Sequence, residues 1–545
     1  MFGPESLRVP SNTHPHHIQS TNTNTLDQVN EDDHFYSAYG TPVSRTQSIR
    51  STFENFAGSY SRASVLYVAD AISHPSSLDH DHLEDEERSF YKSKTNESMK
   101  DTYDSTYRTM SQPPGLVYFE PLSRHTTVGS IISQQFVSAD KPNYGKSSFV
   151  QSVFNAVNVL VGVGILALPL SMRLAGWVYG SLIFLFCSLA TNYTAKVIVK
   201  CLNVHDHAVT YGDMGQVAFG EKGRKLINTI FVIELITIGV ALIVLLGDGL
   251  QSLFPHLSLV QTRMISLVVL LPTVFLPIKK LAYTSLVGII ACICLVMIVL
   301  YDGLSKSEKP GSILDPMETE FFPAHPSPLS FGLIMSGFAG HAVFPSIYRD
   351  MDNPKQYNRM VNVTYVITII VYFLMAVIGY LMFGPTTLQE ITQNVAAIKE
   401  YSQALNRFAI WLLVLTPIAK YGLMLQPLNL SWEIWLLNQP RIETFLKLHQ
   451  QSDNWRKTAL LVIGRSAVTL GLVYIALIFP GFDQVMSLLG ALFSFTISVI
   501  FPLVCHLALF KGQLSVSETV LNWLLLAAAT CMAILGTIWS LFPSL

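Results

Sequence analysis

The stretch Asn155-Ala-Val-Asn158-Val-Leu-Val-Gly162-Val-Gly164-Ile-Leu-Ala-Leu-Pro169 opens the first long apolar run of the chain. Two asparagines, two glycines and a proline interrupt a run that would otherwise read as an ordinary membrane helix. In hydrocarbon every backbone N–H and C=O needs a partner, so backbone that opens at membrane depth must be buried in protein or line a cavity. We therefore expect a broken helix at a binding site.

The composition predicts an all-α membrane protein in two parts. Residues 1–147 are polar and lack a long apolar run, whereas the chain from 148 to 545 is apolar in blocks of about 20 residues, the length that spans a bilayer. The first part is expected to be a disordered cytosolic tail and the second a transmembrane transporter domain. Eleven spans are expected near 148–173, 176–200, 226–252, 261–278, 281–302, 329–349, 361–383, 405–437, 457–479, 482–510 and 517–541.

The charges of the short loops predict the orientation. Loops on the side of the tail carry most of the lysines and arginines, which places the N terminus in the cytosol and, after eleven spans, the C terminus in the lumen or outside. The tail also holds serines next to arginine, such as Ser48 and Ser64. Phosphorylation there would create a docking surface for regulatory proteins; a passive tail is the alternative.

A second interruption lies in the sixth span, in Ser336-Gly337-Phe338-Ala339-Gly340-His341-Ala-Val-Phe-Pro345. Two spans broken by glycine and proline, five spans apart, indicate an inverted-repeat transporter. Repeat one is expected over 148–302, repeat two over 329–510, and an extra helix over 517–541. The alternative is that these glycines only let helices pack closely.

The poles of broken helices favour an amino acid as the ligand. The N-terminal end of a half-helix attracts a carboxylate, and the C-terminal end attracts an ammonium or another cation. A zwitterion satisfies both. The pocket is predicted to be formed by backbone and side chains of the two breaks and of the eighth span, namely Asn155, Asn158, Gly162, Val163, Gly164, Ser336, Gly337, Phe338, Ala339, Gly340 and Tyr421.

Ionisable side chains within spans are costly and are functional candidates. Glu234, His341 and Lys420 are predicted to take part in proton coupling, and the Lys420 ammonium to stand where a related carrier would hold Na⁺. Arg465 and Asp248 lie near span ends and are interpreted as structural. The chain shows no nucleophile–base pair, metal-ligand cluster or phosphate loop, so we expect no enzyme, cofactor or metal site. A net charge of −2 gives no indication of nucleic-acid binding.

Several separated motifs also resemble one family. The Asn158 to Pro169 stretch, the segment Tyr211 to Arg224 and the segment Gly340 to Met351 are similar to signatures of the amino acid/auxin permease family. Glu234, Gly247-Asp248 and Lys420-Tyr421 fit the branch that holds vacuolar and vesicular inhibitory amino acid transporters.

The resemblance implies a leucine-transporter-like five-plus-five fold and proton-linked amino acid transport. For the vacuolar branch it implies uptake of neutral amino acids into an acidic lumen by proton exchange and alternating access, in the vacuolar (lysosome-like) membrane. Two alternatives stay open: a plasma-membrane uptake permease, and an amino acid sensor that signals through the tail.

Overall fold

The computed structural model describes residues 146–205, 208, 210–437, 439, 442 and 454–542. The predicted tail, with its candidate phosphorylation sites, lies outside the described residues apart from its last two positions. The described part is helical almost throughout and has no named β-strand; a single bridge joins Ser147 to Met351. The predicted all-α class is confirmed.

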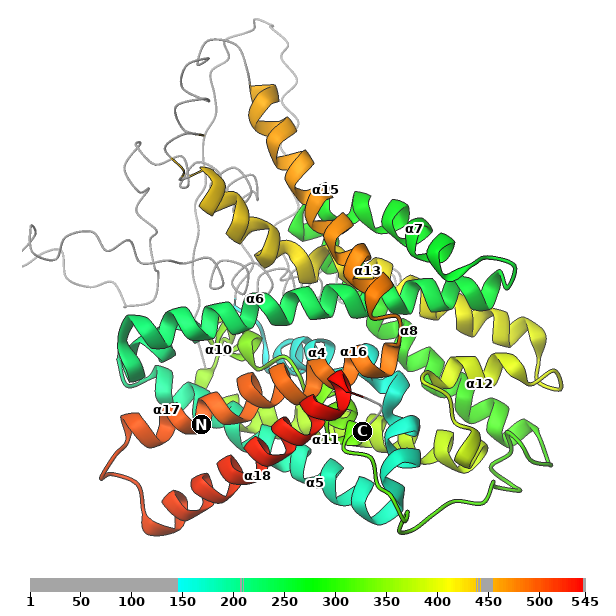
Figure 1. The fold of residues 1–545 in the computed structure, drawn as a ribbon. Coiled ribbons are helices and arrows are strands. Elements are labelled where there is room, and N and C mark those ends of the chain that lie inside the picture. The colour runs from blue at the N-terminus through cyan, green and yellow to red at the C-terminus, as the bar shows by residue number, and fades with distance from the viewer. Residues whose placement is uncertain are drawn as a thin grey trace, which may run out of the picture. The chain divides into compact units, whose positions relative to one another are not determined.

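The helices of the first predicted repeat run in chain order (Figure 1). They are α4 (Phe149–Leu160), the 3₁₀ segment η1 (Val163–Ala167), α5 (Leu168–Leu202), α6 (Tyr211–Leu253), α7 (Leu259–Leu270), η2 (Leu271–Phe275) and α8 (Ile278–Ser305). Several begin with a reciprocal cap: Ser148 and Gln151 form it at α4, and Thr210 and Asp213 at α6.

The helices of the second half follow a long loop. They are α9 (Leu329–Ser336), η3 (His341–Val343), α10 (Phe344–Asp350), η4 (Pro354–Gln356), α11 (Tyr357–Phe383), η5 (Gly384–Thr386), α12 (Ile391–Ala397), α13 (Gln403–Leu437), α15 (Asn454–Ile478), α16 (Phe482–Leu488), the π-helical η6 (Leu489–Ser494) and η7 (Thr496–Ile500), α17 (Phe501–Leu509) and α18 (Val516–Leu541). The helix α18 packs against α9, α16 and α17.

Within the described residues, nine helices are long and apolar enough to cross a membrane. Two shorter apolar segments, Phe149–Leu160 and Leu259–Phe275, occupy the places of the first and fourth predicted spans. All eleven predicted segments are therefore helical, but the count of eleven crossings stays a prediction, as do the boundaries of the repeats.

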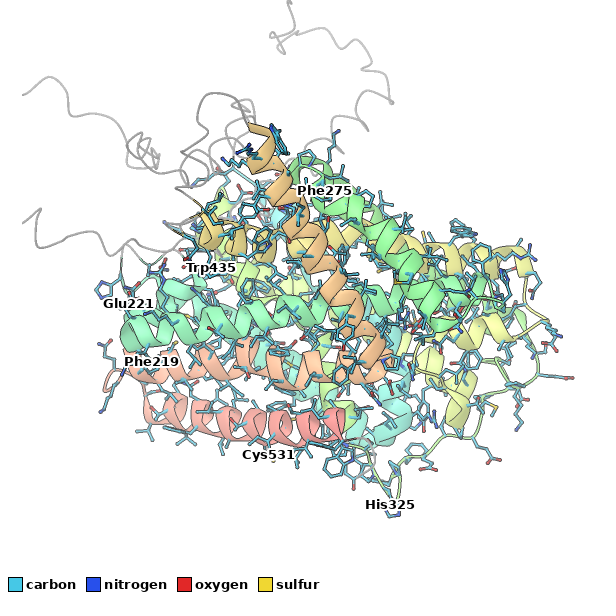
Figure 2. The ribbon with its side chains drawn as sticks, turned by 45° about the horizontal axis from the view of Figure 1, so that its top comes forward. Phe219, Glu221, Phe275, His325, Trp435 and Cys531 are labelled. Carbon is cyan, nitrogen blue, oxygen red and sulfur yellow. The ribbon has the colours of Figure 1, made fainter. Side chains whose placement is uncertain are left out.

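Two glycines with positive φ bend helices that appear continuous. Gly176 (φ 70°) separates the first and second predicted spans inside α5, and a Cβ there would lie 2.4 Å from Pro323. Gly220 (φ 68°) turns the chain inside α6, between Phe219 and Glu221 at one end of that helix (Figure 2). The segment before Gly220, which lies between the second and third predicted spans, is helical because the Thr210 cap starts it.

Candidate functional site

The first break separates α4 from η1. Val161 and Gly162, which we call the first break, have extended backbone, so the last carbonyls of α4 lack helical partners. Two side chains from distant helices replace them. The Tyr372 hydroxyl on α11 donates to the Leu160 carbonyl at 2.5 Å, and the Lys420 ammonium on α13 donates to the Val161 carbonyl at 3.0 Å.

The second break separates α9 from η3 and comprises Gly337 to Gly340. Gly340 has a φ of 117°, a conformation that side chains with a Cβ rarely adopt, and a Cβ there would lie 2.5 Å from Val159 of α4. Glycine at this position therefore serves both the turn and the close approach of α4. The predicted interruption of the sixth span is confirmed.

The start of η1, just after the first break, lies against the second break. A Cβ on Gly164 would lie only 3.1 Å from the Cα and N atoms of Gly337. The Tyr372 hydroxyl, already bonded to the Leu160 carbonyl, lies 2.9 Å from the Gly337 carbonyl as well. A hydroxyl carries one proton, so it donates to one of these two carbonyls at a time.

An aromatic cluster backs the second break. Phe338 is fully buried; its ring meets Phe184 edge-on at 5.5 Å and Tyr372 edge-on at 5.6 Å, and it stacks parallel to Tyr365 at 6.3 Å. These rings come from α5 and α11, so they hold the broken segment between these two helices.

Of the remaining residues predicted to form the pocket, some lie beside one of the breaks and one is not joined to either. Asn155 and Asn158 are buried on α4 in the turns before the first break. The hydroxyl of Ser336 donates to the Leu333 carbonyl of its own helix, and Ala339 is half-buried within the second break. Tyr421 is buried on α13, but no described contact of its hydroxyl joins it to either break.

His341 is oriented toward α5. Its Nε2 lies 3.0 Å from the Thr191 carbonyl and 3.4 Å from the Thr194 hydroxyl, and its ring meets Phe344. Since a carbonyl only accepts, Nε2 carries the hydrogen. The imidazole therefore fastens the second break to α5, and its predicted role in proton coupling stays a prediction.

Glu234 is buried in the middle of α6 with 5% of its surface exposed. The described ion pairs do not include it, whereas Glu433, a buried carboxylate of α13, is paired with Arg465. A carboxyl group without a cation at this depth is consistent with a proton carrier, and the role of Glu234 in proton coupling stays a prediction.

Comparison with known proteins identifies the family. A family model described as "Transmembrane amino acid transporter protein" matches residues 145–543. The chain belongs to this family. It is similar to two Arabidopsis thaliana proteins: "Amino acid transporter AVT1B", at 31% identity over 76% of this chain and 75% of the relative, and "Amino acid transporter AVT1I", at 30% over 73% and 95%.

Solved structures resemble this transporter more distantly. MhsT in complex with L-phenylalanine aligns with a TM-score of 0.43 and 12% identity over 71% of this chain and 98% of that one. A manganese transporter mutant from Eremococcus coleocola aligns with a TM-score of 0.43 and 14% identity over 72% and 88%.

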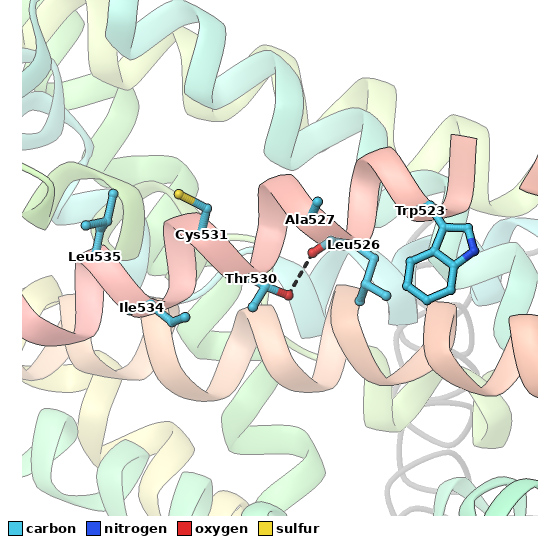
Figure 3. A pocket seen from close by; sticks show the side chains of 7 residues that line it. All are labelled: Trp523, Leu526, Ala527, Thr530, Cys531, Ile534 and Leu535. Carbon is cyan, nitrogen blue, oxygen red and sulfur yellow. Dashed lines mark hydrogen bonds between the residues drawn. The ribbon is translucent and has the colours of Figure 1, made fainter. Parts of the chain in front are cut away.

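A hollow on the surface of the transporter is lined almost entirely by apolar side chains, unlike the two breaks. Side chains of α18 alone line it: Trp523, Leu526, Ala527, Thr530, Cys531, Ile534 and Leu535 (Figure 3). Its one hydroxyl, on Thr530, donates to the Leu526 carbonyl within the helix at 2.7 Å. No charged side chain lines it, so it offers nothing to the two charges of an amino acid, and we interpret it as lipid-facing.

Two buried ion pairs hold the transporter's helices together. Arg465 on α15 binds Glu433 on α13 at 2.6 Å and donates to the Val274 carbonyl of η2. Arg263 on α7 binds Asp248 on α6 at 2.9 Å. The structural interpretation of Arg465 and Asp248 agrees with these pairs.

Sequence reasoning missed three of the residues that shape these sites. Glu433 and Arg263 fall within predicted spans, so the rule that selected Lys420 would also have selected them. Tyr372 carries no such signal, because a tyrosine in an apolar run is ordinary until its partners are known.

Proposed function

We propose that the chain is a proton-coupled secondary transporter that moves neutral amino acids into an acidic organelle lumen, in exchange for protons and by alternating access. The observation that carries the proposal is the close approach of Gly164, just after the first break, to Gly337 in the second, together with the Tyr372 hydroxyl that reaches the Leu160 and Gly337 carbonyls. Family membership supports amino acid transport, and the family resemblance supports the vacuolar (lysosome-like) membrane.

The two breaks would bind opposite ends of the substrate. At the first break Lys420 already occupies the negative end of α4, so this side, with the amide groups of Val163 and Gly164, suits the carboxylate. At the second break the carbonyls that end α9, at Ser336 and Gly337, suit the ammonium.

Lys420 favours protons over sodium as the coupling ion. Its ammonium lies 3.0 Å from the Val161 carbonyl, on the kind of broken-helix oxygen that coordinates Na⁺ in sodium-coupled carriers. A resident cation at that oxygen opposes a second cation by repulsion.

Counterflow of labelled amino acids tests the proposal. The full chain is reconstituted in liposomes with and without an imposed pH gradient, in sodium and in choline buffer. We expect uptake of neutral amino acids that follows the pH gradient and is equal in both buffers. Flux that ignores the gradient, or that requires sodium, would contradict the coupling.

A chain lacking residues 1–140 separates transport from sensing. A transporter should keep its flux without the tail, because both breaks lie after residue 148. Substrate binding without flux in the full chain would instead support the sensor, and flux only at the cell surface would support the plasma-membrane permease.

A further inference from the structure

A second polar cluster lies apart from the breaks, where α6 and α7 pack together and Glu390, the residue before the short helix α12 (Ile391–Ala397), lies near them. Its centre is Arg263, whose side chain is completely buried. The guanidinium binds Asp248 at 2.9 Å, donates to the Val244 carbonyl at 2.7 Å and reaches the Pro480 carbonyl at 3.4 Å. One cation thus fixes the end of α6, the start of α7 and the turn before α16.

Glu390 completes this cluster with a second carboxylate. It precedes α12, in the connection between α11 and α13, and none of its surface is exposed. Neither of its oxygens has a partner at hydrogen-bond geometry among the described residues, and of the uncharged groups nearby the Thr392 hydroxyl of α12 slightly favours the ionised form. The group that faces it is the Asp248 carboxylate, with Arg263 behind.

Two carboxylates that face each other, Glu390 buried and Asp248 largely buried, cannot both ionise readily when one cation serves them. Burial, and then the charge of Asp248, raise the pKa of Glu390 well above its ordinary value, and Arg263 offsets this only in part. The helices α13 and η1 also pack on α12, but no charged group from them is found to act on Glu390 among the described residues.

The cluster is joined to the first break through α12. This helix contacts η1, the segment that follows the first break. Ile391, next to Glu390, and Pro169, which opens α5, both lie against Gly379 of α11. Arg173 of α5 also donates to the Thr387 carbonyl, 2.7 Å away, in the same connection. A movement of α12 would therefore change the cover over the first break.

We propose that Asp248 and Glu390 bind one proton between them, and that this proton holds α12 against α6 beside the first break. With the proton, one carboxyl group donates to the other, and Arg263 balances the remaining negative charge. Without it, two negative charges face one cation in a buried place, so α12 separates and water enters. The shared proton and its effect on α12 do not depend on the proposed transport function. Only the role of α12 as a cover over the substrate rests on that function.

The direction of the pH effect follows from this balance. The form in which α12 lies against α6 binds the proton. This form is therefore fully populated at low pH and is lost as the pH rises through the pKa of the Asp248–Glu390 pair. In the predicted orientation the pair lies on the luminal side. An acidic lumen would then close α12 once the substrate has left.

Infrared spectroscopy of the full chain in liposomes tests proton binding without requiring transport. We expect the wild type at neutral pH to show the carbonyl band of a protonated carboxylic acid that is absent from both Glu390→Gln and Asp248→Asn. In each variant the remaining carboxylate pairs with Arg263 and ionises. Glu400→Gln is the matched control, because Glu400 is exposed in the same connection and contacts Lys306 at 3.6 Å; it should keep the band.

Thiol labelling tests the movement. Val395 lies on α12 and is 2% exposed, so Val395→Cys should react slowly with a membrane-impermeant reagent at low pH. Because the thiolate is the reacting form, each rate is divided by that of the exposed Glu400→Cys at the same pH, and this relative rate should rise with pH by up to about tenfold per pH unit for one proton. In a Glu390→Gln background the relative rate should not depend on pH. The unsubstituted chain gives the background of the native cysteines.

The outcomes separate this inference from the proposed function. An unchanged infrared band in both variants, or a relative labelling rate that keeps its pH dependence in Glu390→Gln, would overturn the shared proton even if flux is normal. A band lost in either monodisperse variant, with pH-dependent labelling, would support it even in a chain that carries no amino acid.

Discussion

Replacing Tyr372 by phenylalanine removes one hydroxyl and keeps the ring that packs on Phe338. That hydroxyl lies 2.5 Å from the Leu160 carbonyl at the end of α4 and 2.9 Å from the Gly337 carbonyl in the second break, so it joins the two interrupted helices. It has one proton, and its loss leaves one buried carbonyl without a donor. Leaving such a group unsatisfied costs about 1–3 kcal/mol.

The loss of this hydrogen bond destabilises the conformation in which the two breaks lie together. If transport passes through that arrangement, Tyr372→Phe should slow counterflow by about 5- to 150-fold, the factor that corresponds to 1–3 kcal/mol. The measurement is the initial rate of labelled amino acid counterflow in liposomes, together with the melting temperature of the purified protein.

Tyr365→Phe is the matched control. Tyr365 lies on the same helix and stacks on the same Phe338 ring at 6.3 Å, but among the described residues its buried hydroxyl is bonded to neither break. It should transport at close to the wild-type rate. Equal rates for Tyr372→Phe and wild type, or an equal loss in both variants, would refute the reasoning.

Three other substitutions test the surroundings of the breaks. Gly164→Ala should slow transport and Gly164→Leu should abolish it while membrane insertion persists, because a Cβ at this position would lie 3.1 Å from Gly337. Near-normal uptake by the leucine variant would contradict the proposed site. Lys420→Met should lower counterflow at least about tenfold, because a buried carbonyl loses its charged donor, and an unchanged rate would argue against the resident cation. Arg465→Met should lower the free energy of unfolding by about 3–5 kcal/mol by leaving Glu433 unpaired, whereas adding Glu433→Met should restore much of it; thermal unfolding distinguishes the two, and a single variant no less stable than the double would count against a buried pair.

The breaks could be predicted from the sequence because their residue types are chemically restrictive. Glycine and proline inside an apolar run favour an interruption of the helix whatever the helix packs against. Gly164 and Gly340 therefore indicate an interruption before any neighbouring residue is known. Lys420 could be selected because a charge in a span needs a partner. Its partner, the Val161 carbonyl, could not be named.

What could not be predicted depends on contacts between distant segments. His341 follows a break, but only the fold shows that its ring turns toward Thr191 of α5. Glu390 lies outside every predicted span, so no rule about charges in membranes selects it, and its burial comes from helices far away in the chain. The bend at Gly176 likewise depends on the close approach of Pro323 from another loop.

The ammonium of Lys420 is tied to its helix by a covalent stem, so it can be neither diluted nor exchanged. A carrier that must bind a metal ion from solution works only where the concentration of that ion is high, and it slows when the concentration falls. A carrier with its positive charge built in has no such dependence. If the proposed mechanism holds, this protein would keep working in sodium-poor compartments, driven by acidity and cargo alone.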